Sequence, residues 1–564
     1  MSNYEWDENA ESDFAQFIRV LGKGRAEGKC KKLGECLQNP NVNIYFAPED
    51  QNLDLFADCA DLPMILRAYF AFKTKRPFSW VGAIHGDRYE LGNKPKYFFN
   101  QLEVPTLTKL FSFISSSFHT GMFRMAPDVE DSDTYPIKVS KESLKPGTLF
   151  YDPNGHVLLV YEIAKDGSVL MLDGHPDNSL TVQTFSSKYV RGRAVTGGGF
   201  RNFRPLIQSG SDVIRVKNEW LPYFSASDQY QKSYKVGGTL VTYYEWVKAK
   251  LSGATDIKYD PLKQIFEKTI GLCGEISERI KSVNAALARE IHLKPHPELL
   301  PENIFGAEGE WESFSTPGRD ARLKASFREV FAYVKKISAL KKNGSSSVKY
   351  QGSFENMILD MHAQFERAIS SPACKFEYQK SDRRFQRLTF ENVENRLFDL
   401  SFDPYHCPEL RWGALQDSSE FESCRDDQIK IDWYNLESRL RNIIDRDLTK
   451  PTTLDTGPEL PEEVRVSWLL KSIVQELDSA PTPGDFPKHE PKRGSICYPI
   501  REGVELYKLP IKSDLNIKTF LNTETRLKIK RRSLDFFKVT SAQGRGWVLG
   551  DDLNCQFESG EALL

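Results

Sequence analysis

The chain has 564 residues, of which 40% are hydrophobic, 27% are charged and 12% are aromatic. This length predicts several domains, and the composition is typical of a globular protein. The formal net charge is −2, so no overall positive charge points to a nucleic-acid partner. No apolar run approaches the roughly 20 residues of a membrane span, and the polar, acidic stretch 1–6 shows no signal peptide.

A cysteine stands at the start of a predicted helix near residue 60. Asp58 is a suitable N-cap, and Pro63 is tolerated only in a first turn. Apolar residues then recur at helical spacing, namely Leu62, Ile65, Leu66 and Tyr69. The positive end of the helix dipole favours the thiolate, which is the nucleophilic form. We therefore interpret Cys59 as a candidate catalytic nucleophile.

Three short strands are predicted farther along the chain, at about 144–151, 154–161 and 168–175. The last two are joined by a tight turn at Asp166-Gly167. His156 opens the second strand, and Asp173 closes the third. Paired residues of adjacent antiparallel strands lie about 5 Å apart, so we expect these two side chains to meet.

The order of these motifs resembles the NlpC-type family of papain-like cell-wall cysteine peptidases. The family pattern is roughly D-C-S-G at the cysteine helix, P-G-D-L at the first strand and H-V-G-I-Y at the base. Here the matching stretches read D-C-A-D at 58–61, P-G-T-L at 146–149 and H-V-L-L-V-Y at 156–161. The resemblance covers scattered motifs between about residues 50 and 180.

The resemblance implies a Cys59 nucleophile and a His156 general base. The family's third polar residue falls at Asp173, which would fix the imidazole tautomer, and His175 is the alternative. The positions implied to bind substrate are Asp58, Ala60 and Asp61. In relatives with an SH3-like domain, the aspartate before the cysteine helps to hold the free amine of the peptide.

The chain divides into four parts by pattern. Residues 1–205 are assigned to the NlpC-type peptidase domain, with an insertion at about 80–143. Apolar stripes at helical spacing predict a mainly helical accessory region at 206–478 with no evident chemistry. Its charged residues Glu310, Arg319, Asp320 and Arg322 are expected at the surface, and a role in a groove is the alternative.

A Pro-rich linker is predicted at 479–494, and strand-like alternation follows at 495–564. The Gly-Trp-Val at 546–548 resembles the final strand of bacterial SH3-like domains. The predicted fold class is therefore α+β, with a papain-like catalytic domain, a mainly helical middle region and a small all-β SH3-like barrel.

The nine cysteines leave the redox compartment open. Without Cys59 eight remain, and three pairs are candidates for disulfides: Cys30 and Cys36, Cys407 and Cys424, and Cys497 and Cys555. Nine reduced thiols are the alternative. We predict no metal site or cofactor, because the chain has no C-x-x-C, and Pro295 breaks the helical spacing of His292 and His296.

We expect a hydrolase that cleaves amide bonds in peptidoglycan stem peptides, commonly after D-glutamate. The resemblance places such a protein in the bacterial periplasm or outside the cell, with the wall as partner and no nucleic acid or membrane span. Two alternatives stay open. One is an inactive wall-binding or scaffolding protein, and the other is a papain-like deamidase or acyltransferase that acts on protein or lipid.

Overall fold

The computed structural model describes two parts of the chain. The first is residues 6–478, except 54, 87, 89, 102, 103, 105, 176, 177, 211, 306–308 and 447–451. The second is seven segments, at 496–499, 504–507, 517–521, 525–533, 536–542, 544–549 and 553–556. The chain folds into two compact units, Met1–Asp478 and Ser479–Leu564. Within these described parts, no helix is both long and apolar enough to cross a membrane.

A six-stranded antiparallel sheet organises the N-terminal part of the first unit, in the order β3-β8-β4-β5-β6-β7. Its strands are β3 (Thr134–Pro136), β4 (Leu149–Asp152), β5 (His156–Ile163), β6 (Val169–Gly174), β7 (Leu180–Thr184) and β8 (Gly199–Phe203). Strands β4, β5 and β6 lie at the three positions predicted from the sequence. The predicted turn at Asp166-Gly167 connects the last two.

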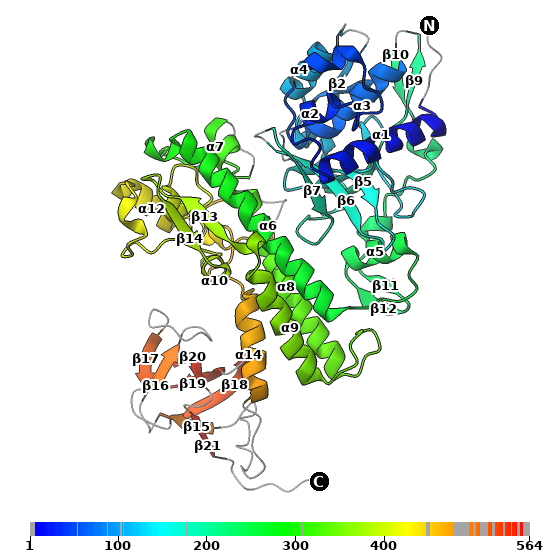
Figure 1. Cartoon of the computed structure of the whole chain (residues 1–564). Helices are drawn as coiled ribbons and strands as arrows, with labels where there is room; N and C mark the ends of the chain where they lie inside the picture. Colours follow the sequence, from blue (N-terminus) through cyan, green and yellow to red (C-terminus); the bar gives the residue numbers. More distant parts are fainter. Residues whose placement is uncertain are drawn as a thin grey trace. The chain divides into compact units, whose positions relative to one another are not determined.

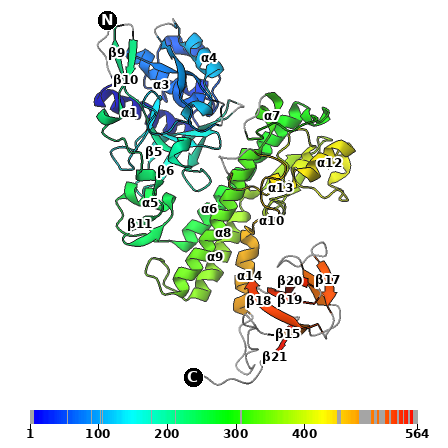
Figure 2. The same cartoon turned by 180° about the vertical axis from the view of Figure 1, so that it is seen from behind.

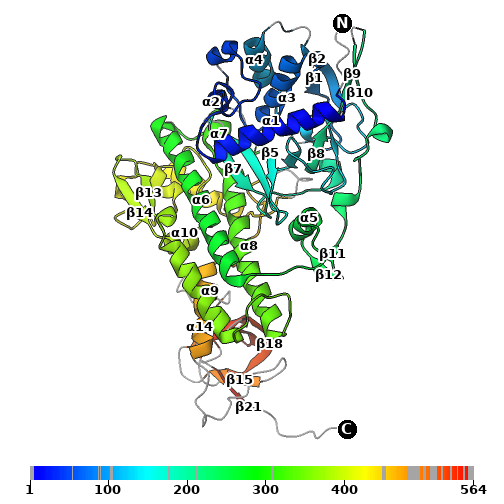
Figure 3. The same cartoon turned by 45° about the vertical axis from the view of Figure 1, so that its right-hand side comes forward.

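The side chains on the two faces of this sheet belong to separate hydrophobic cores. One face packs on α1 (Glu8–Ala26) and α3 (Asp61–Thr74) through Val157, Leu159 and Leu172. The other packs on α5 (Tyr243–Ser252) and β11 (Tyr234–Val236) through Leu158, Val160 and Met171. Figure 3 shows α1 and α5 on opposite sides of β5. Residues beyond 205 therefore complete the core around this sheet.

Helices α1 and α3 are joined by a buried ion pair. Arg67 of α3 is 2% exposed and lies 2.5 and 2.9 Å from the carboxylate oxygens of Glu11 in α1. Its guanidinium also stacks 3.3 Å from the centre of the Trp6 ring. A buried charge is tolerated when it is paired, so this contact fixes α1 against the helix that follows the cysteine.

The segment predicted as an insertion packs on α3. It contains the hairpin of β1 (Ser79–Ile84) and β2 (Pro95–Asn100), followed by α4 (Leu107–Ser117). Aromatic rings join these elements, with ring centroids 5.5 Å apart for Trp80 and Phe99 and 4.1 Å apart for Phe99 and Phe113. The apolar face of α4 thus covers one side of the cysteine helix.

Long helices form the second half of the first unit. Helices α6 (Pro261–Ala288), α8 (Pro317–Lys342), α9 (Phe354–Ile369) and α14 (Val466–Asp478) share one core, and Figures 1 and 2 show α6, α8 and α9 side by side. Asp260 caps α6 by accepting the Lys263 N–H at 3.0 Å. Trp433, Leu436, Leu440 and Ile444 keep the apolar spacing of one helix, but the chain forms two short ones there, α12 (Gln428–Leu436) and α13 (Ser438–Arg441).

Three disulfides occur among the described cysteines. Cys30–Cys36 and Cys407–Cys424 are two of the pairs considered from the sequence. The third, Cys273–Cys374, joins α6 to the segment after α9 across 101 residues and was not foreseen. Cys59 is the free thiol among the residues described. Cys497 and Cys555 are opposite each other in the pairing of β15 with β21, but their side chains lie outside the described residues.

The second unit is built of strands. They are β15 (Ile496–Pro499), β16 (Val504–Tyr507), β17 (Ile517–Leu521), β18 (Leu527–Ser533), β19 (Phe536–Ser541), β20 (Gly544–Leu549) and β21 (Leu553–Gln556). They form one sheet in the order β17-β16-β20-β19-β18-β15-β21. The buried core includes Val504, Leu506, Leu521, Leu527, Val539 and Val548. The predicted linker 479–494 lies outside the described residues.

Candidate active site

Cys59 lies in a turn directly before α3. The Asp58 carboxylate accepts the N–H groups of Ala60 at 2.8 Å and Asp61 at 3.0 Å, so it satisfies donors at the start of this helix. The Asp61 carboxylate in turn lies 3.4 Å from the Asp58 backbone nitrogen. These reciprocal contacts hold the turn that presents the Cys59 sulfur.

A glycine lets the end of β6 approach this turn. A Cβ atom added at Gly174 would lie 2.7 Å from the backbone oxygen of Asp58. Real Cβ atoms do not approach an oxygen so closely, so the contact requires a residue without a side chain. The sequence offered no sign of this role, because the two segments are more than 100 residues apart.

His156 and Asp173 meet as the strand pattern predicted. Strands β5 and β6 pair Val160 with Met171, and alternation places His156 and Asp173 on the same face as that pair. His156 Nε2 lies 3.0 Å from Asp173 Oδ1. Both residues are buried, with relative exposures of 8% and 4%.

His175 lies beside this pair but has a different partner. Its Nε2 is 3.8 Å from Asp173 Oδ2 and only 2.8 Å from the Thr181 hydroxyl oxygen. The closer imidazole to Asp173 is therefore that of His156, which favours Asp173 over His175 as the residue that orients the base.

The Cys59 sulfur lies against the backbone on both sides of His156. Sγ is 4.0 Å from the Gly155 carbonyl oxygen, and the Val157 N–H is directed toward the sulfur. Because Nε2 of His156 faces Asp173, Nδ1 is the ring atom left to accept the thiol proton. The structure thus brings together Cys59, His156 and Asp173.

The electrostatics of Cys59 differ from the sequence-based expectation. Burial and the negative charges of Asp58 and Asp173 raise the pKa of the Cys59 thiol well above its usual value. The helix dipole at the start of α3 favours the thiolate, but burial and these two carboxylates oppose it. At neutral pH, Cys59 is therefore a thiol in the free protein rather than a thiolate.

Asp173 carries its charge in spite of burial. Burial alone would raise the pKa of this carboxyl, but the charges of His156 and His175 outweigh it and hold the pKa well below its usual range. A permanently ionised Asp173 stabilises a protonated His156 imidazole during a reaction.

The three residues expected to bind substrate are placed differently. Asp58 is half-buried and lines the cleft that contains Cys59. Ala60 and Asp61 have relative exposures of 0% and 2%, and neither lines the cleft. Burial and the charge of Asp58 raise the pKa of Asp61 to about 8. Ala60 and Asp61 therefore support the cysteine turn rather than face a ligand.

The candidate site opens into a cleft of about 1830 Å³. One wall is the sheet, and the other is formed by α6 and α8. Contacts along the cleft hold the walls together, including Lys188 to Glu275 at 3.1 Å and Lys336 to Glu245 at 2.6 Å. The helical region, which showed no chemistry in the sequence, thus shapes the candidate active site.

The charged residues at the start of α8 are not simple surface groups. Asp320 is 1% exposed and pairs with Arg279 of α6 at 2.7 and 3.1 Å, so its expected surface position was wrong. Arg319 and Arg322 are half-buried and line the cleft. The position of Arg319 and Arg322 agrees with the alternative of a groove, whereas the burial of Asp320 depends on the packing of α8 against α6 and leaves no sign in the sequence.

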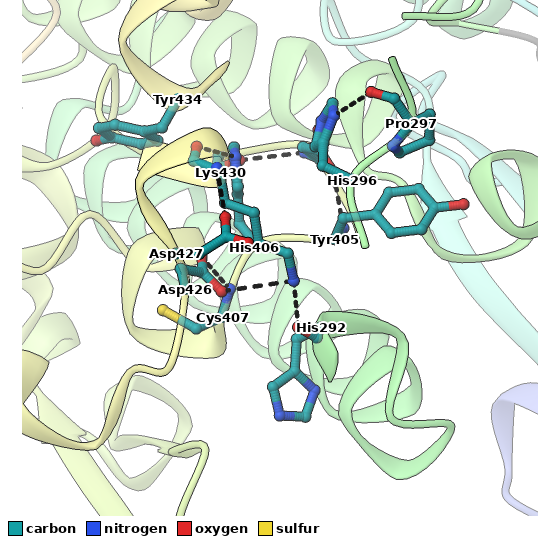
Figure 4. Close-up of polar contacts among 12 residues, drawn as sticks. His292, His296, Pro297, Tyr405, His406, Cys407, Asp426, Asp427, Lys430 and Tyr434 are labelled. Atoms are coloured by element: carbon teal, nitrogen blue, oxygen red, sulfur yellow. Dashed lines mark hydrogen bonds and ion pairs between the residues drawn. The ribbon is translucent and has the colours of Figure 1, made fainter. Parts of the chain in front are cut away.

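A second cluster of histidine and aspartate lies within the helical half of the unit. His296 Nε2 is 2.8 Å from Asp403 Oδ2, and both side chains are fully buried. Figure 4 shows the other ring contacts, from His296 Nδ1 to the Pro297 carbonyl at 2.6 Å and from His406 Nε2 to the Lys430 carbonyl at 3.1 Å.

His406 Nδ1 lies 2.6 Å from the Ser401 hydroxyl, which completes the partners of this cluster. All four ring nitrogens of His296 and His406 therefore have a hydrogen-bonding partner within the fold. We interpret the cluster as a structural network that ties these loops together.

No family model matches the chain, and no match to a curated protein or to a solved structure was found.

Proposed function

We propose that the protein is a papain-like cysteine hydrolase that cleaves an amide bond through an acyl-enzyme on Cys59. The observation that carries this proposal is the 3.0 Å contact between His156 and Asp173 in the cleft where the Cys59 sulfur lies against the His156 backbone. A thiol, an imidazole and an ionised carboxylate in this order form the arrangement required for nucleophilic catalysis.

The reaction would run in two halves. His156 Nδ1 takes the thiol proton as the Cys59 sulfur attacks the carbonyl carbon, and the same proton passes to the departing amine when the C–N bond breaks. A water molecule then attacks the thioester, with its proton going to His156; the acid leaves as the C–S bond breaks, and His156 returns the proton to the Cys59 sulfur. The Cys59 N–H, which has no hydrogen bond within the described residues, is free to bind the oxyanion.

The raised pKa of Cys59 suggests how a substrate would favour attack. Asp58 lines the cleft, and its negative charge is one cause of the raised pKa. A cationic amine bound at Asp58 would cancel this charge and lower the pKa of the thiol. A peptide with a free amino group is therefore the substrate class that the cleft favours.

We infer that the substrate is a stem peptide of peptidoglycan, cleaved outside the cytoplasm of a bacterium. The three disulfides support an oxidising compartment, because such bonds are rare in reducing cytosol. The all-strand second unit is proposed to be an SH3-like domain that binds wall or peptide.

Product analysis by mass spectrometry tests the hydrolase. Purified wall and soluble stem peptides are incubated with the wild type and with Cys59→Ala. New peptide fragments from the wild type alone are expected, and their masses identify the bond. Equal product patterns from both proteins would contradict the proposal.

An inactive wall-binding protein is the second candidate, favoured by the raised pKa of Cys59 in the free protein. In that case both proteins sediment with insoluble wall, and neither releases a fragment. The assay above therefore separates the two candidates directly.

A further inference from the structure

Helix α8 begins inside the candidate cleft. The residues around its first turn, at 315–319, line the cavity together with Cys59, His156 and Asp173. Arg319 and Arg322 extend from this turn. The Arg322 guanidinium folds back over the helix start, because Nη1 lies 3.6 Å from the position a Cβ would take at Gly318.

The two guanidinium groups lie near negative charges but are not hydrogen-bonded to them; Asp173, Glu278 and Asp320 attract Arg319 electrostatically. Within the described part of the chain, neither Arg319 nor Arg322 makes a hydrogen bond or ion pair. Asp320 between them is already bound by Arg279, and Arg328 farther along α8 is held by both oxygens of Asp445 at 2.6 and 2.7 Å. A partly buried arginine is ordinarily paired, so two unpaired ones in a cleft are unusual.

The two arginines also lie close to each other and to the histidines of the site. Burial and the like charge of Arg322 lower the pKa of Arg319. The charge of Arg319 acts on His175, and that of Arg322 acts on Asp173. Asp58, in contrast, lies near Arg88 and Glu312, which pair with each other at 2.7 Å. The unpaired positive charges therefore lie on the His175 side of the site.

We propose that Arg319 and Arg322 bind a free carboxylate of the substrate, so that the cleft selects peptides with an acidic group next to the bond that is cleaved. This inference rests on the proposed hydrolase function. Guanidinium groups bind carboxylates through paired, charge-assisted hydrogen bonds, and neither of these two makes such a bond to the described residues. A negative group also relieves the repulsion between the two arginines.

The proposal identifies a substrate with two opposite charges. An amino group would bind near Asp58, and a carboxylate would bind at the start of α8. A D-glutamate linked through its side-chain carboxyl keeps a free α-carboxylate beside the scissile bond. Its amidated form, D-isoglutamine, differs only by an uncharged amide in place of that carboxylate.

The test compares two tripeptides, L-Ala–γ-D-Glu–L-Lys and L-Ala–γ-D-isoGln–L-Lys, with the wild type, Arg319→Gln, Arg322→Gln and Arg322→Lys. The wild type is expected to prefer the carboxylate peptide about 10- to 100-fold in kcat/KM, the value of a charge-assisted hydrogen bond. Each Gln variant loses most of this preference, mainly through KM, and Lys restores part of it. Lys335→Gln is the control, because this exposed residue of α8 lies outside the cleft lining.

Binding to Cys59→Ala, measured by calorimetry, separates the two proposals. Selective binding of the carboxylate peptide, lost in Cys59→Ala combined with Arg322→Gln, supports the arginine site even if the wild type cleaves neither peptide. Equal affinity for both peptides, or no binding of either, overturns it whatever the fate of the hydrolase. An unchanged circular dichroism spectrum and melting temperature confirm that each variant is folded.

Discussion

Two clusters of histidine and aspartate in the first unit share their chemistry and differ in what surrounds them. In the sheet, His156 and Asp173 lie 3.0 Å apart beside a thiol and a cleft. In the helical half, His296 and Asp403 lie 2.8 Å apart with no exposed side-chain surface. The residue types are the same in both clusters, whereas the ring nitrogen without a partner among the described residues and the thiol beside it make the first cluster the candidate for catalysis.

The largest expected effect is the loss of activity when His156 is removed from the cluster beside the cleft. We expect His156→Ala to lower kcat/KM by about 10²- to 10⁴-fold, the range for a positioned general base. Steady-state assays on the peptide identified by product analysis measure the rate, and a melting curve controls for folding. Full activity of this variant would contradict the role of His156.

The corresponding change in the fully buried cluster of His296 and Asp403 should lower the free energy of unfolding. Asp403→Ala leaves the His296 ring and the Tyr405 N–H, which Asp403 accepts at 2.7 Å, without their partner. Breaking a buried pair of this kind costs about 3–5 kcal/mol. Guanidinium unfolding measures the loss, and a change below about 1 kcal/mol would mean that this network contributes little.

A smaller effect is expected from the charge beside the nucleophile. Asp58→Asn removes one of the negative charges that raise the pKa of Cys59, so the pKa should fall. A fall of one unit makes the thiolate about tenfold more abundant at a given pH below the pKa. The rate of alkylation by iodoacetamide against pH measures this change. An unchanged or higher midpoint would rule out Asp58 as a cause of the raised pKa.

The last effect is a pH dependence and concerns Asp61, whose pKa of about 8 is raised by burial and by the charge of Asp58. Unfolded aspartate has a pKa near 3.9, so between about pH 4 and pH 8 the folded state holds a proton that the unfolded state lacks. The free energy of unfolding contributed by this group therefore falls as the pH rises through this range. Asp61→Asn should flatten the dependence, measured by guanidinium unfolding at about pH 5 and pH 8. If the free energy of unfolding depends on pH equally steeply in the variant, the dependence comes from groups other than Asp61.

Local patterns in the sequence predicted the elements that carry the candidate site. The alternation around His156 and Asp173 located β5 and β6, and the spacing of Leu62 and Ile65 located the cysteine helix. Such patterns repeat within a few residues, so they can be recognised in the sequence before the fold is known. The pairing of Cys30 with Cys36 is short-range in the same way.

The features that were not predicted all depend on segments far apart in the chain. Gly174 touches the cysteine turn, Cys273 reaches Cys374, and the start of α8 enters the cleft only after the helical half has packed on the sheet. The direction of the Cys59 pKa was misjudged mainly because burial, which depends on the packing of distant segments, raises it; the charges of the adjacent Asp58 and the distant Asp173 add to this effect. None of these contacts leaves a periodic signal in the sequence.

The start of α8 has a consequence for how such a protein could change over evolution. The residues proposed to break the bond rest on the two cores around the sheet, while Arg319 and Arg322 are carried by a helix of 26 residues anchored in the separate core of α6, α9 and α14. Substitutions in the first turn of that helix can alter which peptides are accepted and leave the support of the bond-breaking residues untouched. Under the proposed function, the choice of substrate could therefore change without altering the packing beneath the bond-breaking residues, although the charge of Arg322 still acts on Asp173.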